Sequence, residues 1–240
     1  MARDSLAGQV VSLSSKRLVK ETPRPGGGDA LLRDVVSGGA FDGAVTGFVL
    51  SCLPDSDAPV LWVSCRTSRQ ENGRIYGPGL RQFGLKADVL RVEVSHPRDV
   101  LWAMEEGAAC AGLSAVVGEI HGAPEVLSFT ATKRLALRSE ASGVPVWLMR
   151  SGDHGALSAA RERWRLTSLP SDVHVWNRAA PGAPVWEADL FRARGRAPGV
   201  WTARHDGAAR RAADRLRLLS RSGDGPVATD CQPRADLAGG

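Results

Sequence analysis

Apolar runs of strand length alternate with helix-like segments between residues 59 and 120, and this alternation constrains the fold more than any other feature. The runs at 59–64, 89–94 and 113–120 are rich in aliphatic side chains, and residues 97–111 have the spacing of an amphipathic helix. Strands separated by helical segments are typical of βαβ units, whose parallel sheet is covered on both faces. The alternation therefore predicts an α/β fold with a mostly parallel central sheet flanked by helices.

The pattern continues towards the C-terminus. Residues 128–143 predict a helix that stops at Gly143, and residues 144–150 predict a fourth strand. Residues 158–166 lead into another strand, and residues 184–205 have the pattern of a closing β-hairpin. We therefore expect the sheet to end in antiparallel strands.

Three other segments indicate irregular or helical structure. The polar residues 65–73 predict a loop at the carboxyl end of a strand, where α/β sheets bind ligands, and its candidate contacts are Arg66, Arg69 and Glu71. Pro78 and Gly79 argue against a helix between residues 74 and 83. Residues 208–220 indicate a short basic helix.

A Pro- and Gly-rich break at residues 22–28 separates an N-terminal arm from the rest of the chain. The predicted organisation is an arm and linker at 1–28, a core at 29–205, and a tail at 206–240 that begins basic. The end of this tail, residues 222–240, is rich in Gly, Pro and Asp, a composition typical of disorder.

Composition narrows the class of protein. No apolar run is long enough to span a membrane, and the first residues lack the apolar core of a signal peptide, so we expect a cytoplasmic protein with no membrane partner. The four cysteines are widely spaced and form no CxxC pair, so neither a zinc site nor a disulfide framework is indicated.

Positive charge is concentrated in the C-terminal half. Residues 1–149 carry 16 Lys+Arg and 16 Asp+Glu, whereas residues 150–221 carry 14 Arg and 7 acids. Alternating arginines in extended segments would share one face of a strand. They could contact phosphates or an acidic partner, or they could simply be solvated. The candidate contacts to DNA or protein are Arg150, Arg161, Arg163, Arg165, Arg192, Arg194 and Arg196.

Residues 41–53 resemble a glycine-containing loop that enters a helix. A phosphate-binding loop at this place needs a lysine to neutralise the triphosphate, and no lysine lies between Glu21 and Lys86. We interpret Gly43 and Gly47 as residues that allow a tight turn and close packing. With Thr46 they define a vestigial nucleotide loop.

The strand at 115–120 ends in an acid, which is the setting in which a nucleotide hydrolase holds Mg²⁺. Glu119 is the only carboxylate there, and Gly118 occupies the place where an Asp would be expected. Nucleophilic catalysis is not indicated either, because the chain has no GxSxG elbow. The sequence therefore predicts no catalytic residues, no metal site and no required cofactor.

Several blocks resemble the RecA recombinase core in order, and more closely the ImuA family. They include LWVSC (61–65), YGPGL (76–80), AVVGEIHG (115–122) and ATKRLAL (131–137), and the likeness covers roughly residues 30–205. The resemblance implies a RecA-like core and a role in SOS-induced translesion mutagenesis. It also implies an ImuB-type polymerase-like partner and an error-prone replicative-type polymerase.

Relative to RecA, the resemblance implies three losses: the loop lysine, the strand-end Asp at Gly118, and a catalytic Glu that would fall near Cys65 or Arg66. The leading hypothesis is therefore a non-catalytic adaptor, associated with the nucleoid, that binds an ImuB-type partner and either single-stranded DNA or protein. An active RecA-type ATPase, which would use ATP and Mg²⁺, and a SulA-like cell-division inhibitor are the two alternatives.

Overall fold

The computed structural model describes residues 25, 31–39, 42–152 and 157–220. These residues form one nine-stranded sheet with the strand order β3-β2-β4-β5-β1-β6-β7-β8-β9. The strands are β1 Leu32–Ser37, β2 Val60–Cys65, β3 Val89–Val94, β4 Ala115–His121, β5 Val146–Ser151, β6 Glu162–Leu169, β7 Val185–Ala193, β8 Gly199–His205 and β9 Leu216–Ser220. The N-terminal arm, apart from residue 25, and the end of the tail lie outside the described residues.

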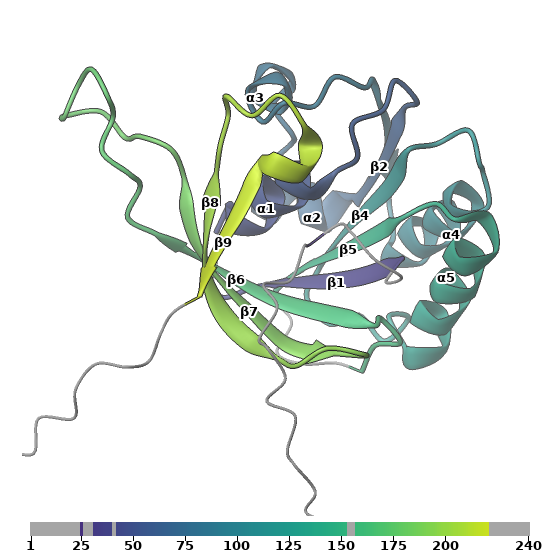
Figure 1. Ribbon diagram of the computed structural model, residues 1–240. Coiled ribbons are helices and arrows are strands. Elements are labelled where there is room, and N and C mark those ends of the chain that lie inside the picture. The colour runs from purple at the N-terminus through teal and green to yellow at the C-terminus, as the bar shows by residue number, and fades with distance from the viewer. Residues whose placement is uncertain (1–24, 26–30, 40–41, 153–156, 221–240) are drawn as a thin grey trace, which may run out of the picture.

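Neighbouring strands from β3 to β6 are parallel, and β6 to β9 pair antiparallel. Figure 1 shows how helices cover this sheet on two sides. The helices are α1 Ala44–Cys52, α2 Arg66–Asn72, α3 Gly77–Gln82, α4 Pro97–Ala108 and α5 Phe129–Ser142, with a 3₁₀ turn η1 at Ala212–Asp214. The predicted α/β fold, with a mostly parallel sheet and a C-terminal hairpin formed by β7 and β8, is confirmed.

Two apolar cores lie on opposite faces of the sheet. One packs α1 against the sheet through aromatic side chains, including Phe48, Trp164 and Trp186. The other packs α4 and α5 through aliphatic side chains such as Met104 and Leu135. Side chains alternate between the two faces of a strand, so neighbouring residues of β4 and β5 enter different cores.

The strongest helix predictions are confirmed. In α5, the Ser128 hydroxyl accepts a hydrogen bond from the Ala131 N–H at 3.2 Å, and Gly143 adopts a left-handed conformation with φ 78°. Both ends therefore satisfy backbone groups that a helix terminus leaves unpaired. In α4, the expected apolar stripe is buried, and it consists of Val100, Leu101, Met104 and Ala108.

Three local predictions are wrong. Residues 66–72 form α2 instead of a loop, held by the Ser68 hydroxyl, which donates to the Glu119 carbonyl at 3.0 Å. Residues 77–82 form α3, because Pro78 lies in the first turn, where proline costs no backbone hydrogen bond. The basic helix expected at 208–220 is instead η1 and strand β9, since pairing with β8 gives this segment backbone partners.

Within the described residues, no helix is both long enough and apolar enough to cross a membrane.

Candidate functional site

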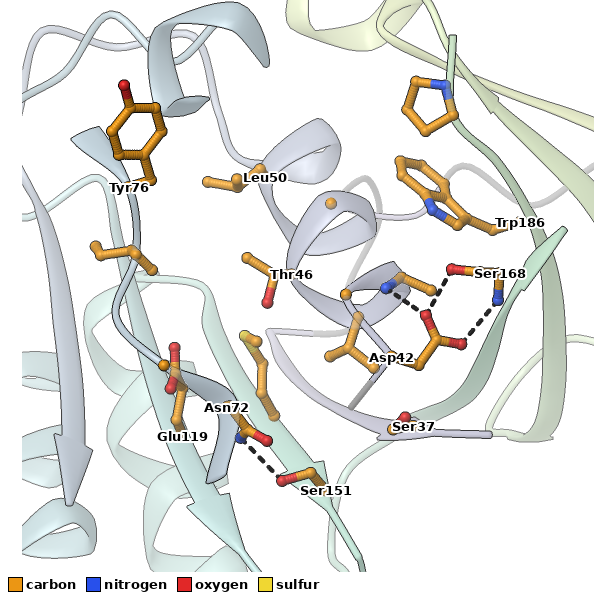
Figure 2. Close-up of a pocket in the computed structure, with 18 of the residues that line it drawn as sticks. Ser37, Asp42, Thr46, Leu50, Asn72, Tyr76, Glu119, Ser151, Ser168 and Trp186 are labelled. Atoms are coloured by element: carbon orange, nitrogen blue, oxygen red, sulfur yellow. Dashed lines mark hydrogen bonds between the residues drawn. The ribbon is translucent and has the colours of Figure 1, made fainter. Parts of the chain in front are cut away.

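A cavity of about 500 Å³ lies beside the start of α1, at the carboxyl ends of β1, β4 and β5. This edge of a parallel sheet is where α/β proteins place ligands. All four residues of the predicted vestigial nucleotide site line the cavity: Gly43, Thr46, Gly47 and Glu119. We call this cavity the α1 pocket, and Figure 2 shows Thr46 and Glu119 directed into it.

A carboxylate occupies the start of α1. The Asp42 carboxylate accepts hydrogen bonds from the Ala44 N–H at 2.9 Å, from the Ser168 N–H at 2.8 Å and from the Ser168 hydroxyl at 2.6 Å (Figure 2). The positive end of a helix dipole attracts anions, and here the protein supplies its own. Sequence reasoning missed Asp42 and Ser168, which lie 126 residues apart.

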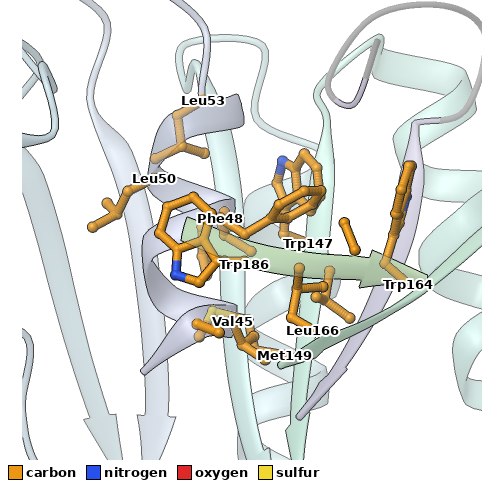
Figure 3. Close-up of a cluster of buried hydrophobic side chains, with 14 of the residues drawn as sticks. Val45, Phe48, Leu50, Leu53, Trp147, Met149, Trp164, Leu166 and Trp186 are labelled. Atoms are coloured by element: carbon orange, nitrogen blue, oxygen red, sulfur yellow. The ribbon is translucent and has the colours of Figure 1, made fainter. Parts of the chain in front are cut away.

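Gly47 is required by packing. A Cβ atom at this position would lie 2.5 Å from a ring carbon of Trp186 in β7, and Figure 3 shows this indole among the side chains of α1. Gly43 has φ −71° and open space where a Cβ would stand. The close-packing interpretation therefore holds for Gly47, whereas no such constraint acts on Gly43.

Glu119 is a buried acid with a perturbed pKa. One of its carboxyl oxygens accepts a hydrogen bond from the Trp62 indole N–H at 2.6 Å. Burial raises the pKa of Glu119 to about 7, although the Trp62 hydrogen bond and the nearby Arg69 oppose that shift. This carboxyl group is therefore only partly ionised at neutral pH.

Gly118 faces away from the α1 pocket. A Cβ at this position would lie 2.0 Å from the Met104 sulfur, in the core beneath α4. Side chains alternate along β4, so Glu119 faces the pocket and residue 118 cannot. The expectation that Gly118 marks a lost pocket carboxylate is therefore wrong, and Glu119 is the residue of β4 that lines the pocket.

The cations that reach the α1 pocket are already paired. Arg74 Nε lies 3.1 Å from Glu93, and Arg150 Nε lies 3.0 Å from Asp34. None of the described residues lining the pocket is a lysine. Of the candidates in the 65–73 segment, Glu71 lines the pocket, while Arg69 donates to the Ser64 carbonyl at 2.9 Å and pairs with Glu93. Arg66 is exposed.

Two of the predicted contact arginines are structural. Asp34 in the central strand β1 pairs with Arg150 of β5 at 3.0 Å and with Arg163 of β6 at 3.2 Å. The two arginines are only 1% and 4% exposed. Their assignment as DNA or partner contacts is therefore wrong, because neighbouring strands bury both guanidiniums against one carboxylate.

The other five arginines lie nearer the surface. Arg161 pairs with Glu140 at 2.7 Å and Arg165 with Asp189 at 3.0 Å, while Arg196 pairs closely with Glu162. As the alternation predicted, Arg163 and Arg165 share a face of β6, where both guanidiniums lie within 5.0 Å of the Phe191 ring centroid. Arg192 and Arg194 are exposed.

An exposed apolar loop was missed by sequence reasoning. Residues 170–183 project from the sheet between β6 and β7 (Figure 1), and we call them the tryptophan loop. Val173, Val175 and Trp176 in this loop are 73%, 84% and 91% exposed. Three apolar residues in a short segment bounded by prolines were the only available signal.

The sequence of this chain is similar to that of a known protein. No family model matches the chain. Protein ImuA from Caulobacter vibrioides, in strains NA1000 / CB15N and ATCC 19089 / CIP 103742 / CB 15, is 28% identical over 176 residues, which cover 69% of this chain and 68% of the relative.

Structural likenesses are weaker. SulA from Pseudomonas aeruginosa has a TM-score of 0.38 and 19% identity, covering 52% of this chain and 100% of that chain. A DnaB-like replicative helicase, described in its interactions with primase, has a TM-score of 0.43 and 9% identity, covering 80% of this chain and 57% of that chain. These TM-scores are too low to carry a functional argument. The similarity to Protein ImuA spans two thirds of both sequences, and this chain is therefore similar to the ImuA family over most of its length.

Proposed function

We propose that this chain is a non-catalytic accessory factor of translesion DNA synthesis that bridges an ImuB-type polymerase-like subunit and DNA. Similarity to Protein ImuA supports a role in damage-induced mutagenesis. The adaptor role, the absence of ATP hydrolysis and the partners, including an error-prone replicative-type polymerase, are our proposals.

The observation that carries the proposal is the Asp42 carboxylate at the start of α1. A triphosphate in the α1 pocket would place its negative charge beside this group. Two like charges 4 Å apart repel by about 4 kcal/mol at the effective dielectric near a protein surface. Because Arg74 and Arg150 are committed to Glu93 and Asp34, they are poorly placed to offset this repulsion.

Glu119 supports the same conclusion. A carboxyl group with a pKa of about 7 is only half ionised at neutral pH, and one of its oxygens already accepts the Trp62 hydrogen bond. A carboxyl group binds Mg²⁺ in its ionised form, so a raised pKa weakens Mg²⁺ binding by this group at neutral pH. Glu119 therefore suits a buried structural acid better than a metal ligand.

The tryptophan loop supports partner binding. Exposed apolar patches mark interaction sites, and tryptophan is enriched among residues that dominate interface energies. The loop is held by local contacts, since His174 Nδ1 accepts from the Trp176 and Asn177 N–H groups and Asp172 pairs with Arg204 at 2.6 Å. Apart from Asp172, Arg178 is the only Asp, Glu, Lys or Arg in residues 170–183. An apolar pocket on a protein therefore fits this loop better than phosphates do.

Nucleotide titration tests the non-catalytic part. We expect calorimetry with ATP and Mg²⁺ to give no saturable binding below millimolar concentration, and hydrolysis to stay at background with or without single-stranded DNA. ATP turnover by the purified chain that disappears in Thr46→Ala or Glu119→Gln would establish the ATPase alternative instead.

Co-purification tests the adaptor part. We expect the ImuB-type subunit to be captured by this chain, and Trp176→Ala to weaken capture about tenfold, the effect of losing one dominant contact. Trp102→Ala is the matched control, because Trp102 is 65% exposed on α4, away from the tryptophan loop. Recovery of a tubulin-like division GTPase in place of the ImuB-type subunit would favour the division-inhibitor alternative.

A further inference from the structure

A second cavity, of about 540 Å³, lies between the end of α3 and the connection from β8 to β9. Four of the seven residues that line it are cations: Arg81, Lys86, Arg210 and Arg215. We call it the basic hollow. It is formed by two segments that are far apart in the sequence, so no local motif predicts it.

Arg215 is the buried member of the hollow. Its side chain is 3% exposed, and its one ion pair in the described part of the chain is a long contact of 3.4 Å from Nη2 to Asp55. Nε and Nη1 are buried and have no hydrogen-bond partner among the described residues. A buried donor without a partner costs about 1–3 kcal/mol. The guanidinium of Arg215 is therefore buried here although two of its nitrogens lack a hydrogen-bond partner among the described residues.

The backbone is shaped around this guanidinium. Gly84 has φ 79°, and a Cβ there would lie 2.8 Å from Arg215 Nε. A side chain at residue 84 would therefore push the guanidinium out of its place. The left-handed turn at Gly84 gives Arg215 its position against the backbone at the base of the hollow.

The charge of the hollow is not balanced. Lys86 Nζ lies 3.3 Å from Asp55, the same carboxylate that contacts Arg215. One carboxylate thus serves two cations, while Arg81 and Arg210 are exposed at the rim. Arg211 in the same connection and Arg217 in β9 are also exposed, although Arg217 pairs with Asp206 at 3.2 Å.

We propose that the basic hollow binds phosphate groups of a single-stranded DNA. Guanidinium groups in a partly desolvated site bind phosphate oxygens strongly, and several exposed cations at the rim fit the repeated charge of a strand. The site rests on the adaptor function proposed above and supplies its DNA contact. It lies apart from the α1 pocket and from the arginines of β6 and β7 that the sequence suggested.

Fluorescence anisotropy with a labelled oligo(dT) strand and the full chain tests this site. The deciding variant is Arg81→Ala/Lys86→Ala/Arg210→Ala, because all three side chains are exposed. We expect affinity at low salt to fall at least tenfold. The slope of log affinity against log salt should also fall by about 2, since each lost single-strand phosphate contact contributes about 0.7.

The control is a triple variant with the same charge loss, Arg98→Ala/Lys133→Ala/Arg138→Ala. These residues are also two arginines and a lysine, and they are exposed on α4 and α5, on the other side of the sheet. We expect this control to bind with nearly unchanged affinity and slope. Equal losses in both triple variants would show a general charge effect and overturn the site.

Two further outcomes bear on the ligand. Arg215→Lys keeps the charge but loses the planar donors, so we expect it to weaken DNA binding. Thermal melting of the same variant checks that the chain is still folded. Inorganic phosphate should compete with the strand at matched ionic strength. Unchanged binding in the first triple variant would overturn the proposal.

Failure here is distinguishable from failure of the adaptor role. The triple variant of the hollow leaves the tryptophan loop intact, so capture of the ImuB-type subunit should be unchanged. Loss of DNA binding with retained capture is the expected pair of results, and loss of capture in this variant would contradict it.

Discussion

The α1 pocket and the basic hollow are similar in volume, about 500 and 540 Å³, but opposite in electrostatics. In the pocket, Arg74 and Arg150 each have a carboxylate partner, and Asp42 adds negative charge at the start of α1. In the hollow, one carboxylate serves two of four cations. The α1 pocket, where the sequence suggested a vestigial nucleotide loop, is therefore unfavourable for anions, whereas the basic hollow carries an excess of positive charge.

The comparison depends first on Asp34, which pairs with Arg150 at the pocket and with Arg163 in the neighbouring strand β6. Asp34→Ala should lower the free energy of unfolding by about 3–5 kcal/mol, because Arg150 and Arg163 would lose their shared buried carboxylate. Urea denaturation measures this loss. Asp172→Ala, which breaks the exposed pair with Arg204, is the control and should cost less than about 1 kcal/mol. Similar costs for the two variants would mean that the Asp34 pairs contribute little.

The second prediction concerns how the stability contributed by Glu119 in the pocket depends on pH. Burial raises its pKa from 4.5 to about 7, so the folded state holds the proton more tightly than the unfolded state. The stability that this group contributes is complete below its ordinary pKa and is lost as the pH rises through about 7. Its full size is roughly 3 kcal/mol.

The measurement is the difference in unfolding free energy between Glu119→Gln and the parent chain at about pH 5 and pH 8. Gln cannot ionise, so we expect the variant to gain relative to the parent as the pH rises. A difference that does not change with pH would show that Glu119 is ionised normally in the folded chain.

Gly47 offers a smaller test of why glycines line the pocket. Gly47→Ala should cost about 1–3 kcal/mol, because the new Cβ meets Trp186 at 2.5 Å. Gly43→Ala, at a position with open space around it, should cost less than about 1 kcal/mol. Thermal melting of the two variants compares them directly. If Gly43→Ala were the more harmful, the glycines would instead serve a backbone role at the loop.

Elements whose ends or apolar faces are marked by nearby residues could be predicted from the sequence. Ser128 and Gly143 mark the ends of α5, and the apolar stripe of α4 has helical spacing, so both helices followed from the sequence. Helix α2 has one buried residue, Ser68, and no apolar period, so its stability comes from contacts that reach β4. Strand β9 likewise needs β8 beside it, and no pattern within residues 208–220 reveals that partner.

The sequence by itself determined the α/β alternation and the lack of a lysine between Glu21 and Lys86, because both are properties of residue order. Only the tertiary structure decided which arginines can meet a ligand. Arg163 and Arg165 follow the same alternating pattern, yet Arg163 is buried against Asp34, 129 residues away, and Arg165 is exposed. Burial and ion pairing depend on which strands become neighbours, and that arrangement is set by packing of the whole sheet.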